Sequence, residues 1–206
     1  MSENDDFSLL MDTKRLETLV DGIFAIAMTL LVLGLAVPQI APPVTEATLQ
    51  AAILGIVPNL ISRVVSFVLL AVFWKIHHKI FKRIKYMNGT LLWINVIWLL
   101  FIVLVPFSAS LTGDYGNLYT SHLIFNLNML GISTLLFLNW HYANKTNLIH
   151  EKVGKKYIDV TWRVNAGFII VVLAAMVLTF IIPQFSSIVY LITIPMEYIV
   201  KSISGV

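Results

Sequence analysis

The stretch that decides the fold is Arg15-Leu-Glu-Thr-Leu-Val-Asp-Gly-Ile-Phe-Ala-Ile-Ala-Met-Thr-Leu-Leu31. It begins with charged residues, among them Arg15 and Asp21, and then continues without any charge as far as Thr45. A charge-free run of this length is enough for a helix across the hydrocarbon core of a bilayer, which takes about 20 residues. The stretch therefore predicts a membrane-spanning helix whose charged beginning lies at the boundary between lipid and water.

The composition extends this prediction to the whole chain. Of its 206 residues, 58% are hydrophobic and only 12% are charged, and the mean hydropathy is +0.86. A soluble domain of this size needs far more charge to solvate its surface. No Asp, Glu, Lys or Arg occurs in four long runs, 22–45, 86–113, 115–144 and 164–196. We therefore expect an all-α integral membrane protein, and the absence of cysteine excludes disulfides and cysteine-ligated metal sites.

The apolar runs predict six membrane-spanning helices in one domain, 1–206, with a short N-terminal tail over 1–14. We place the spans at 16–37, 49–83, 87–110, 118–143, 158–182 and 186–200. Pro38, Pro42 and Pro43 end the first span, and Pro183 separates the fifth span from the sixth. The sixth span is short and contains Pro195, so it is the least regular of the six.

Lysine and arginine placement predicts the orientation of the chain. Basic residues cluster in two of the loops, between 75 and 85 and between 145 and 163. The alternate loops, 38–48, 111–117 and 183–185, contain no lysine or arginine. Basic loops stay on the cytoplasmic side of a membrane, so both termini and both basic loops are expected in the cytoplasm. The net charge of +3 is then explained by topology, and no nucleic-acid partner is implied.

Several classes of transporter and site lack their sequence signatures. The chain has no Gly-x4-Gly-Lys-Ser/Thr loop, no helix with arginine at every third position and no Thr-Val-Gly-Tyr-Gly loop. It therefore shows no sign of an ATP-driven pump, a voltage sensor or a carbonyl-lined potassium filter. Adjacent His77 and His78 point about 100° apart on a helix, with no further ligand at helical spacing. We expect no enzyme activity, no metal site and no cofactor.

The first span has one face that differs from the rest. At about 100° per residue, one stripe of the helix contains Thr18, Gly22, Ile26, Thr29, Leu33 and Ala36, and Arg15 falls on its extension. One interpretation is that the Thr29 hydroxyl bonds back to its own helix and has no functional role. The other is a pore wall, in which Ile26 and Leu33 form narrow apolar rings and Thr29 a polar ring between them. Periodicity alone leaves both interpretations open.

A second group of polar residues lies at the start of the first span and the end of the second. Counted along the two helices in opposite directions, Asp21 is level with Trp74, His77 and His78, and Arg15 is near them. One interpretation treats these as ordinary interfacial charges and an aromatic anchor. The other, which we favour for the group as a whole, is a polar hydrogen-bonded network in a poorly solvated boundary.

Arg63 is the charge placed deepest in the predicted membrane. It lies roughly 18 Å from Lys75 along the second span, at 1.5 Å per residue. Its side chain can extend to the membrane surface, pair with Glu46 or face a water-filled vestibule. We expect the first of these.

Three motifs resemble one known family. They are Arg15-Leu-Glu-Thr-Leu-Val-Asp21, then Ser66-Phe67 followed by Trp74-Lys-Ile-His77-His78, and finally Leu91-Leu-Trp-Ile-Asn95 followed by Leu104-Val-Pro106-Phe107 and Gly113-Asp-Tyr115. Together they resemble the prokaryotic homologues of the endosomal and lysosomal potassium channel, transmembrane protein 175. The first motif corresponds to that family's Arg-x-x-x-Phe-Ser-Asp signature. It departs from the signature at Leu19-Val20, where the family has Phe-Ser.

The resemblance implies a homotetramer of six-helix subunits, with a central pore lined by the first helix. By position, Ile26 would be the main constriction, Thr29 a layer tied to potassium preference, and Leu33 a further pore layer. The family's polar network that supports the pore helix would correspond to Arg15, Asp21, Trp74 and His77, with His78 beside it. Val20 brings no hydroxyl to such a network.

We therefore expect a potassium-preferring cation channel in the plasma membrane of a prokaryote. It would conduct passively, and its expected partners are potassium and other monovalent cations, the lipid bilayer and further copies of the chain. The alternative is a small-solute or proton-coupled transporter that uses Asp21 and the histidines. A third class is a structural or assembly membrane protein without conductance.

Overall fold

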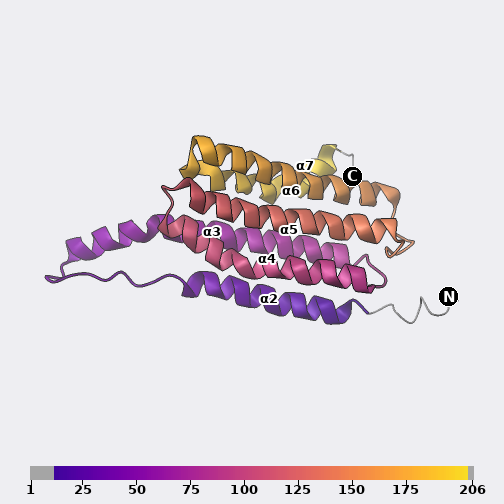
Figure 1. Cartoon of the computed structure of the whole chain (residues 1–206), viewed down its shortest axis with the longest axis horizontal. Helices are drawn as coiled ribbons and strands as arrows, with labels where there is room; N and C mark the ends of the chain where they lie inside the picture. Colours follow the sequence, from indigo (N-terminus) through magenta and orange to yellow (C-terminus); the bar gives the residue numbers. More distant parts are fainter. Residues whose placement is uncertain (1–11, 204–206) are drawn as a thin grey trace.

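The computed structural model describes residues 12–203, apart from the side chains at 184, 185 and 203. Most of the expected N-terminal tail, 1–14, thus lies outside the described residues. The elements follow one another as five long helices and a broken sixth segment (Figure 1). They are α2 (Lys14–Leu33), α3 (Glu46–Phe81), α4 (Gly89–Asp114), α5 (Tyr119–Lys145), α6 (Lys155–Ile181), the 3-10 helix η1 (Pro183–Ile192) and α7 (Thr193–Ile203).

The five long helices agree with the first five predicted spans. Each is long and apolar enough to cross a membrane, and their lengths run from 20 residues in α2 to 36 in α3. The boundaries are set by local hydrogen bonds. Thr45 and Thr48 form a reciprocal capping box at the start of α3, and the Asn88 side chain accepts a hydrogen bond from the Leu91 amide at the start of α4.

The sixth predicted span is not one continuous α-helix. Pro183 opens a ten-residue 3-10 helix, η1, and only then does α7 begin, with Pro195 in its first turn. At about 2.0 Å per residue for a 3-10 helix and 1.5 Å for an α-helix, the two segments together extend about 36 Å. They pack against α6, and Glu197 of α7 pairs with Lys79 of α3 at 2.6 Å. The predicted helix is thus replaced by a broken segment that is longer than the predicted span.

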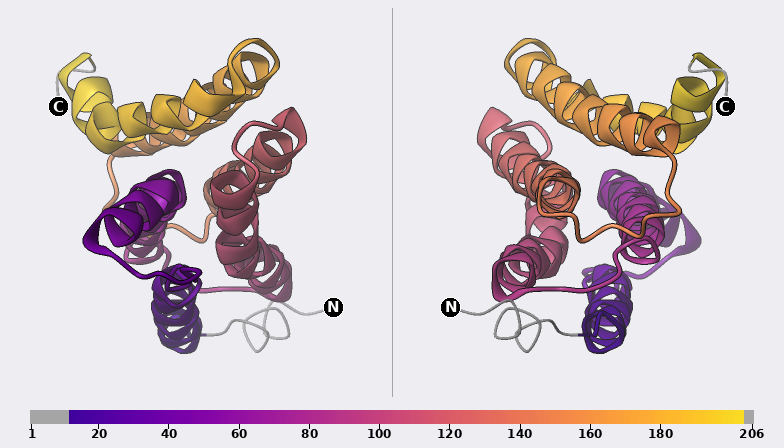
Figure 2. Two further views of the ribbon diagram at one scale, coloured as in Figure 1. Left: turned by 90° about the vertical axis from the view of Figure 1, so that its left-hand side faces the viewer. Right: turned by 90° about the vertical axis from the view of Figure 1, so that its right-hand side faces the viewer.

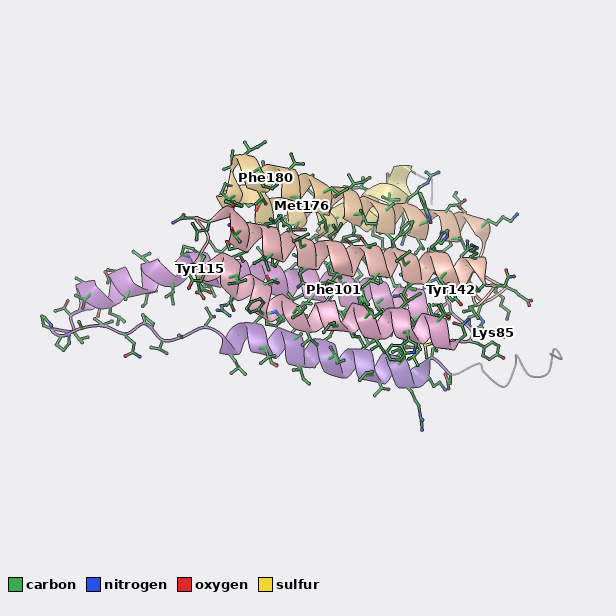
Figure 3. The ribbon with its side chains drawn as sticks, in the orientation of Figure 1. Lys85, Phe101, Tyr115, Tyr142, Met176 and Phe180 are labelled. Carbon is green, nitrogen blue, oxygen red and sulfur yellow. The ribbon has the colours of Figure 1, made fainter. Side chains whose placement is uncertain are left out.

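The helices run alternately up and down, so the two basic loops lie at one end of the bundle. There, Ile84 and Ile149 form an antiparallel bridge, supported by a 2.7 Å hydrogen bond from the Lys85 amide to the Leu148 carbonyl. We call this end the basic end and the opposite one the far end. Figure 3 shows Lys85 and Tyr142 at the basic end, with Tyr115 and Phe180 toward the far end.

Helix α2 occupies the edge of the bundle, on the side away from α6 (Figure 2). It packs against α3 and α4 through one buried stripe, formed by Leu16, Val20, Phe24, Ala27 and Leu31. The Phe24 ring contacts Trp98 of α4, with 5.6 Å between the ring centroids. Residues at this spacing occupy a single helix face, so the opposite face of α2 is left without cover from its own chain.

Helix α3 extends beyond the other helices at the far end (Figure 1). Its contacts with the end of α4 are made by Asn59 and Ser62, and the residues before Pro58 project past that point. At 1.5 Å per residue, 46–58 form an extension of about 20 Å. The bundle therefore ends near Asn59.

Candidate functional site

The predicted pore stripe is the uncovered face of α2. Its residues within α2 are all exposed, Thr18, Gly22, Ile26, Thr29 and Leu33, and the side chains of Ile26 and Leu33 are 60% and 78% exposed. Ala36, the last predicted member, is exposed but lies beyond the end of the helix. The stripe lies opposite the buried face of the helix. Apolar side chains that one chain leaves exposed in a membrane protein must meet lipid, another subunit or a pore.

The Thr29 hydroxyl bonds to its own helix. Its Oγ1 donates to the Ile26 carbonyl at 2.8 Å, as the simpler interpretation of the sequence requires. A hydroxyl has one proton and two lone pairs. Because the proton is directed to Ile26, the oxygen keeps accepting capacity on an exposed side chain. The backbone bond thus does not exclude contact between Thr29 and a cation.

At the basic end, α2 is tied to α3 by Asp21. Trp74 Nε1 donates to Asp21 Oδ1 at 2.7 Å, and the Trp74 ring stacks on His78 with 5.9 Å between centroids. Trp74 is 41% exposed, so this contact lies at the surface of the chain. Three of the five residues predicted for the supporting network are thus neighbours.

His77 turns the other way, into the bundle. Its ring is buried between Phe81 and Trp98, at centroid distances of 4.2 and 4.5 Å. Its Nε2 lies 3.0 Å from Asn95 Oδ1, and Asn95 donates both amide hydrogens, to the Leu91 carbonyl and to Asn139 Oδ1. The Asn95 oxygen must therefore accept, so His77 Nε2 is the donor.

This buried chain joins α3, α4 and α5, and the sequence interpretation did not include Asn95 or Asn139 in the site. An asparagine inside a charge-free run was a usable signal, because an amide in an apolar environment needs partners. Asn95 was in view only as part of a family motif.

The other members of the family motif take different places. Arg15 is exposed at the start of α2, and within 12–203 we find no hydrogen bond or ion pair of its side chain. Val20, which replaces the family's serine, is 2% exposed and belongs to the core, whereas Leu19 is 48% exposed. At this departure from the signature, the Val20 side chain thus packs in the apolar core.

Arg63 does not extend to the membrane surface, so that expectation was wrong. The side chain is buried, with 4% exposure. Its Nη1 donates to the Leu31 carbonyl at 3.2 Å, and its Nε donates to Asn59 Oδ1 at 2.6 Å. Neither partner is Glu46. The guanidinium instead joins the last turn of α2 to α3.

Asn59 continues this contact to α4, because its amide nitrogen donates to the carboxylate of Asp114. We call the group formed by the Leu31 carbonyl, Arg63, Asn59 and Asp114 the far-end clamp. Sequence reasoning missed Asn59 and Asp114. Asn59 lies four residues before Arg63 on the same helix face, and this spacing could have predicted their contact. No local pattern in the sequence could have predicted the contact between Asn59 and α4.

The described residues offer no metal centre. Within 12–203 there is no group of three or more His, Cys, Asp or Glu side chains that could hold a metal ion. The geometry of α2 therefore combines an exposed stripe with one polar attachment near each end, and no catalytic constellation.

Comparison with known proteins identifies the same helices. The family described as endosomal/lysosomal potassium channel TMEM175 matches residues 15–106, which cover α2, α3 and most of α4. A potassium channel of Chryseobacterium sp. (strain P1-3) is 33% identical over 103 residues, 50% of this chain and 50% of that protein. The chain thus matches half the length of this relative. A potassium channel of Chamaesiphon minutus is 29% identical over 170 residues, 79% of this chain and 83% of that protein.

The fold agrees with these matches. The crystal structure of a lysosomal potassium-selective channel TMEM175 homolog from Chamaesiphon minutus superposes with a TM-score of 0.78 at 25% identity, over 94% of this chain and 98% of that one. TMEM175 is a family of potassium channels and not of enzymes, in agreement with the expectation of no catalytic site and no cofactor. In sequence and in fold, the chain is therefore similar to the TMEM175 family of potassium channels.

Proposed function

We propose that the chain is a potassium-preferring cation channel, a homotetramer with a central pore lined by α2. The observation that carries this proposal is the uncovered stripe with Ile26, Thr29 and Leu33. Four copies arranged around an axis would cover these side chains from lipid and place each layer in a ring. The names of the relatives, potassium channels in two bacteria, support the same function.

Selectivity in such a pore would come from side chains. The backbone carbonyls within an α-helix are engaged in internal hydrogen bonds, so they cannot replace the water around an ion as filter-loop carbonyls do. Ile26 and Leu33 would form apolar constrictions, and Thr29 would present four hydroxyl oxygens between them. The accepting capacity of Thr29, left free by its bond to Ile26, supports contact with a partly dehydrated cation.

The orientation follows from the basic end. We assign both termini and the two basic loops to the cytoplasm of a prokaryotic cell, and the far end to the outside. The chain, 1–206, would form one channel domain per subunit, and Asp21 and Trp74 would support the pore helix near its cytoplasmic end.

Potassium flux from liposomes tests the proposal. Purified protein is reconstituted into potassium-loaded liposomes and planar bilayers, and sodium is compared with potassium. Replacing Thr29 by valine removes the hydroxyl at nearly constant shape and should reduce the preference for potassium, whereas Thr29→Ser should retain most of it. Ile26→Ala and Leu33→Ala should change flux by widening an apolar ring.

The control is Val177→Ala, an equally apolar and 63% exposed position on α6, away from α2. It should leave flux and selectivity unchanged. Unchanged conductance in all the α2 variants would remove the stripe from the pore. Saturable, pH-coupled uptake without single-channel currents would instead support the transporter alternative, and an absence of any flux would support a structural role.

A further inference from the structure

The strongest unassigned feature is the far-end clamp, since a buried arginine in a membrane helix needs a reason. Arg63 is the only charged side chain among those described in 12–203 that is classed as buried. Its side chain is 4% exposed, and the guanidinium donates hydrogen bonds to the Leu31 carbonyl and to Asn59 Oδ1. The charge of Arg63 therefore lies at the C-terminal end of α2.

The end of α2 lacks a backbone donor for the Leu31 carbonyl. The Gly34 amide bonds to Leu30 and the Leu35 amide to Val32, so the helical partner of the Leu31 carbonyl is lost. The last turn of α2 also carries no basic residue. Arg63 supplies both a donor for this carbonyl and a positive charge at the helix C-terminus, where the partial charge of the helix is negative.

Two glycines make room for the clamp. A Cβ at Gly34 would overlap Nη1 of Arg63, and a Cβ at Gly113 would lie 2.6 Å from Asn59 Oδ1 and 3.0 Å from its Cα. Neither position has room for a side chain, because Arg63 lies close to the Gly34 backbone and Asn59 lies close to the Gly113 backbone. Asn59 can face only one way, since its oxygen accepts from Arg63 and its nitrogen donates to Asp114. Three helices are thus joined at one level.

We propose that Arg63 is a positioning residue for conduction, which holds the last turn of α2 and thereby places the outer apolar ring at Leu33. This inference rests on the proposed function. Leu33 lies two residues after the carbonyl that Arg63 holds, and one residue before the glycine that accommodates the guanidinium. The clamp also borders a cavity of about 350 Å³ beside the segment after α2, so a released helix end has space to move.

The charges of the clamp fit a cation pathway. Asp114 belongs to the same hydrogen-bonded group as Arg63, so the formal charges sum to zero. A guanidinium near the outer ring therefore positions the helix without a net positive charge in the group that would repel potassium.

The first test measures the helix end without relying on conduction. In Arg63→Gln and Gly34→Ala, the amides of Gly34 and Leu35 should exchange with deuterium about tenfold faster than in the unaltered protein, because a charge-assisted bond is lost. The matched control is Arg163→Gln, an exposed arginine on α6 with no hydrogen bond recorded within 12–203. It should leave these amides unchanged.

The second test measures the pore. Arg63→Gln and Gly34→Ala should alter unitary conductance in planar bilayers, and Leu33→Ala should have a smaller effect when Arg63 is already replaced, because the two residues act on one ring. A purely structural role would lower the yield of folded protein and leave unitary conductance unchanged. Should Arg63→Gln fail to fold, Gly34→Ala and Arg63→Lys provide the same comparison.

The outcomes separate the two proposals. Currents in the unaltered protein together with unchanged conductance and exchange in the folded variants overturn the inference alone. An unaltered protein that carries no current overturns the proposed function and the pore role of Arg63 with it. Faster exchange together with altered conductance in the variants supports both.

Discussion

Each end of α2 is held by a hydrogen bond from α3, but the acceptor on α2 is a side chain at one end and a backbone carbonyl at the other. At the basic end a side chain of α2, Asp21, accepts a hydrogen bond from Trp74. At the far end the backbone of α2 accepts one, from the buried guanidinium of Arg63. The first contact is exposed and the second is enclosed, so water competes for the first and is largely excluded from the second. The far end should therefore be the more costly attachment to break.

The exposed attachment has a second layer below it. His77, Asn95 and Asn139 join α3 to α4 and α5 just inside the bundle. This layer orients the helix that carries Trp74 and does not touch α2 through hydrogen bonds. Both ends thus hold α2 by a direct hydrogen bond from α3, but the bond at the basic end is exposed and has a buried polar layer behind it, whereas the bond at the far end is itself buried. Mutations at the two ends should differ accordingly.

The largest effect is expected for Asn59→Leu. This change removes the acceptor of Arg63 Nε and the donor to Asp114 at nearly constant size. A hydrogen bond to a charged group is worth about 1.5–3 kcal/mol. The bond to Arg63 is partly buried and the bond to Asp114 is exposed, so the unfolding free energy should fall by roughly 3 kcal/mol, mostly through Arg63. Denaturation in detergent measures it. Gln50→Leu, an exposed amide on the same helix, should change little, and equal effects at the two positions would contradict an enclosed clamp.

A smaller effect is expected for Trp74→Phe, which removes the donor to Asp21 and keeps an aromatic ring beside His78. Because the contact is exposed, we expect a loss of about 0.5–1 kcal/mol in the same denaturation experiment. Trp93→Phe is the matched control, since Trp93 is 66% exposed on α4 and has no hydrogen bond recorded within 12–203. A loss at Trp74 as large as at Asn59 would reverse the ranking of the two ends.

The smallest effect is expected for Arg15→Gln. The side chain is exposed and lacks a partner within the described part of its own subunit, so unfolding free energy should change by less than about 0.5 kcal/mol. Cross-linking should be run beside denaturation. Lys145→Gln, an exposed charge at the same end on α5, is the control. A specific loss of cross-linked tetramer in Arg15→Gln would place the partner of Arg15 in a neighbouring subunit, whereas a large loss of subunit stability would contradict its exposure.

Much of the fold could be predicted because it follows from local properties of the chain. Five of the six predicted spans are long helices, since runs without charge and bounded by proline or polar residues have few other structures in a bilayer. The same holds for the stripe on α2, whose exposure follows from a helical period that also sets the buried face. The sixth span was misjudged because Pro183 and Pro195 shape the backbone over several residues, and apolar composition does not distinguish a 3-10 helix from an α-helix.

Much less of the site's hydrogen bonding could be predicted. Asp21 and Trp74 were matched by counting depth along two antiparallel helices, and they are in fact bonded. The same counting put His77 with them, but adjacent residues on a helix face different neighbours, and His77 meets Asn95. For Arg63, extension to the surface was expected because the sequence does not show which carbonyl of another helix lacks a partner.

The sequence by itself thus determined that the chain spans a membrane, where its long helices lie and which face of α2 its own subunit leaves uncovered. These properties depend on hydropathy and helical period, and both can be determined from a continuous stretch of sequence. Only the tertiary structure decided how α2 is held. The Leu31 carbonyl that Arg63 holds and the Asn95 oxygen that His77 meets lie 32 and 18 residues away in the chain. These pairings depend on which atoms remain unsatisfied after the helices have packed.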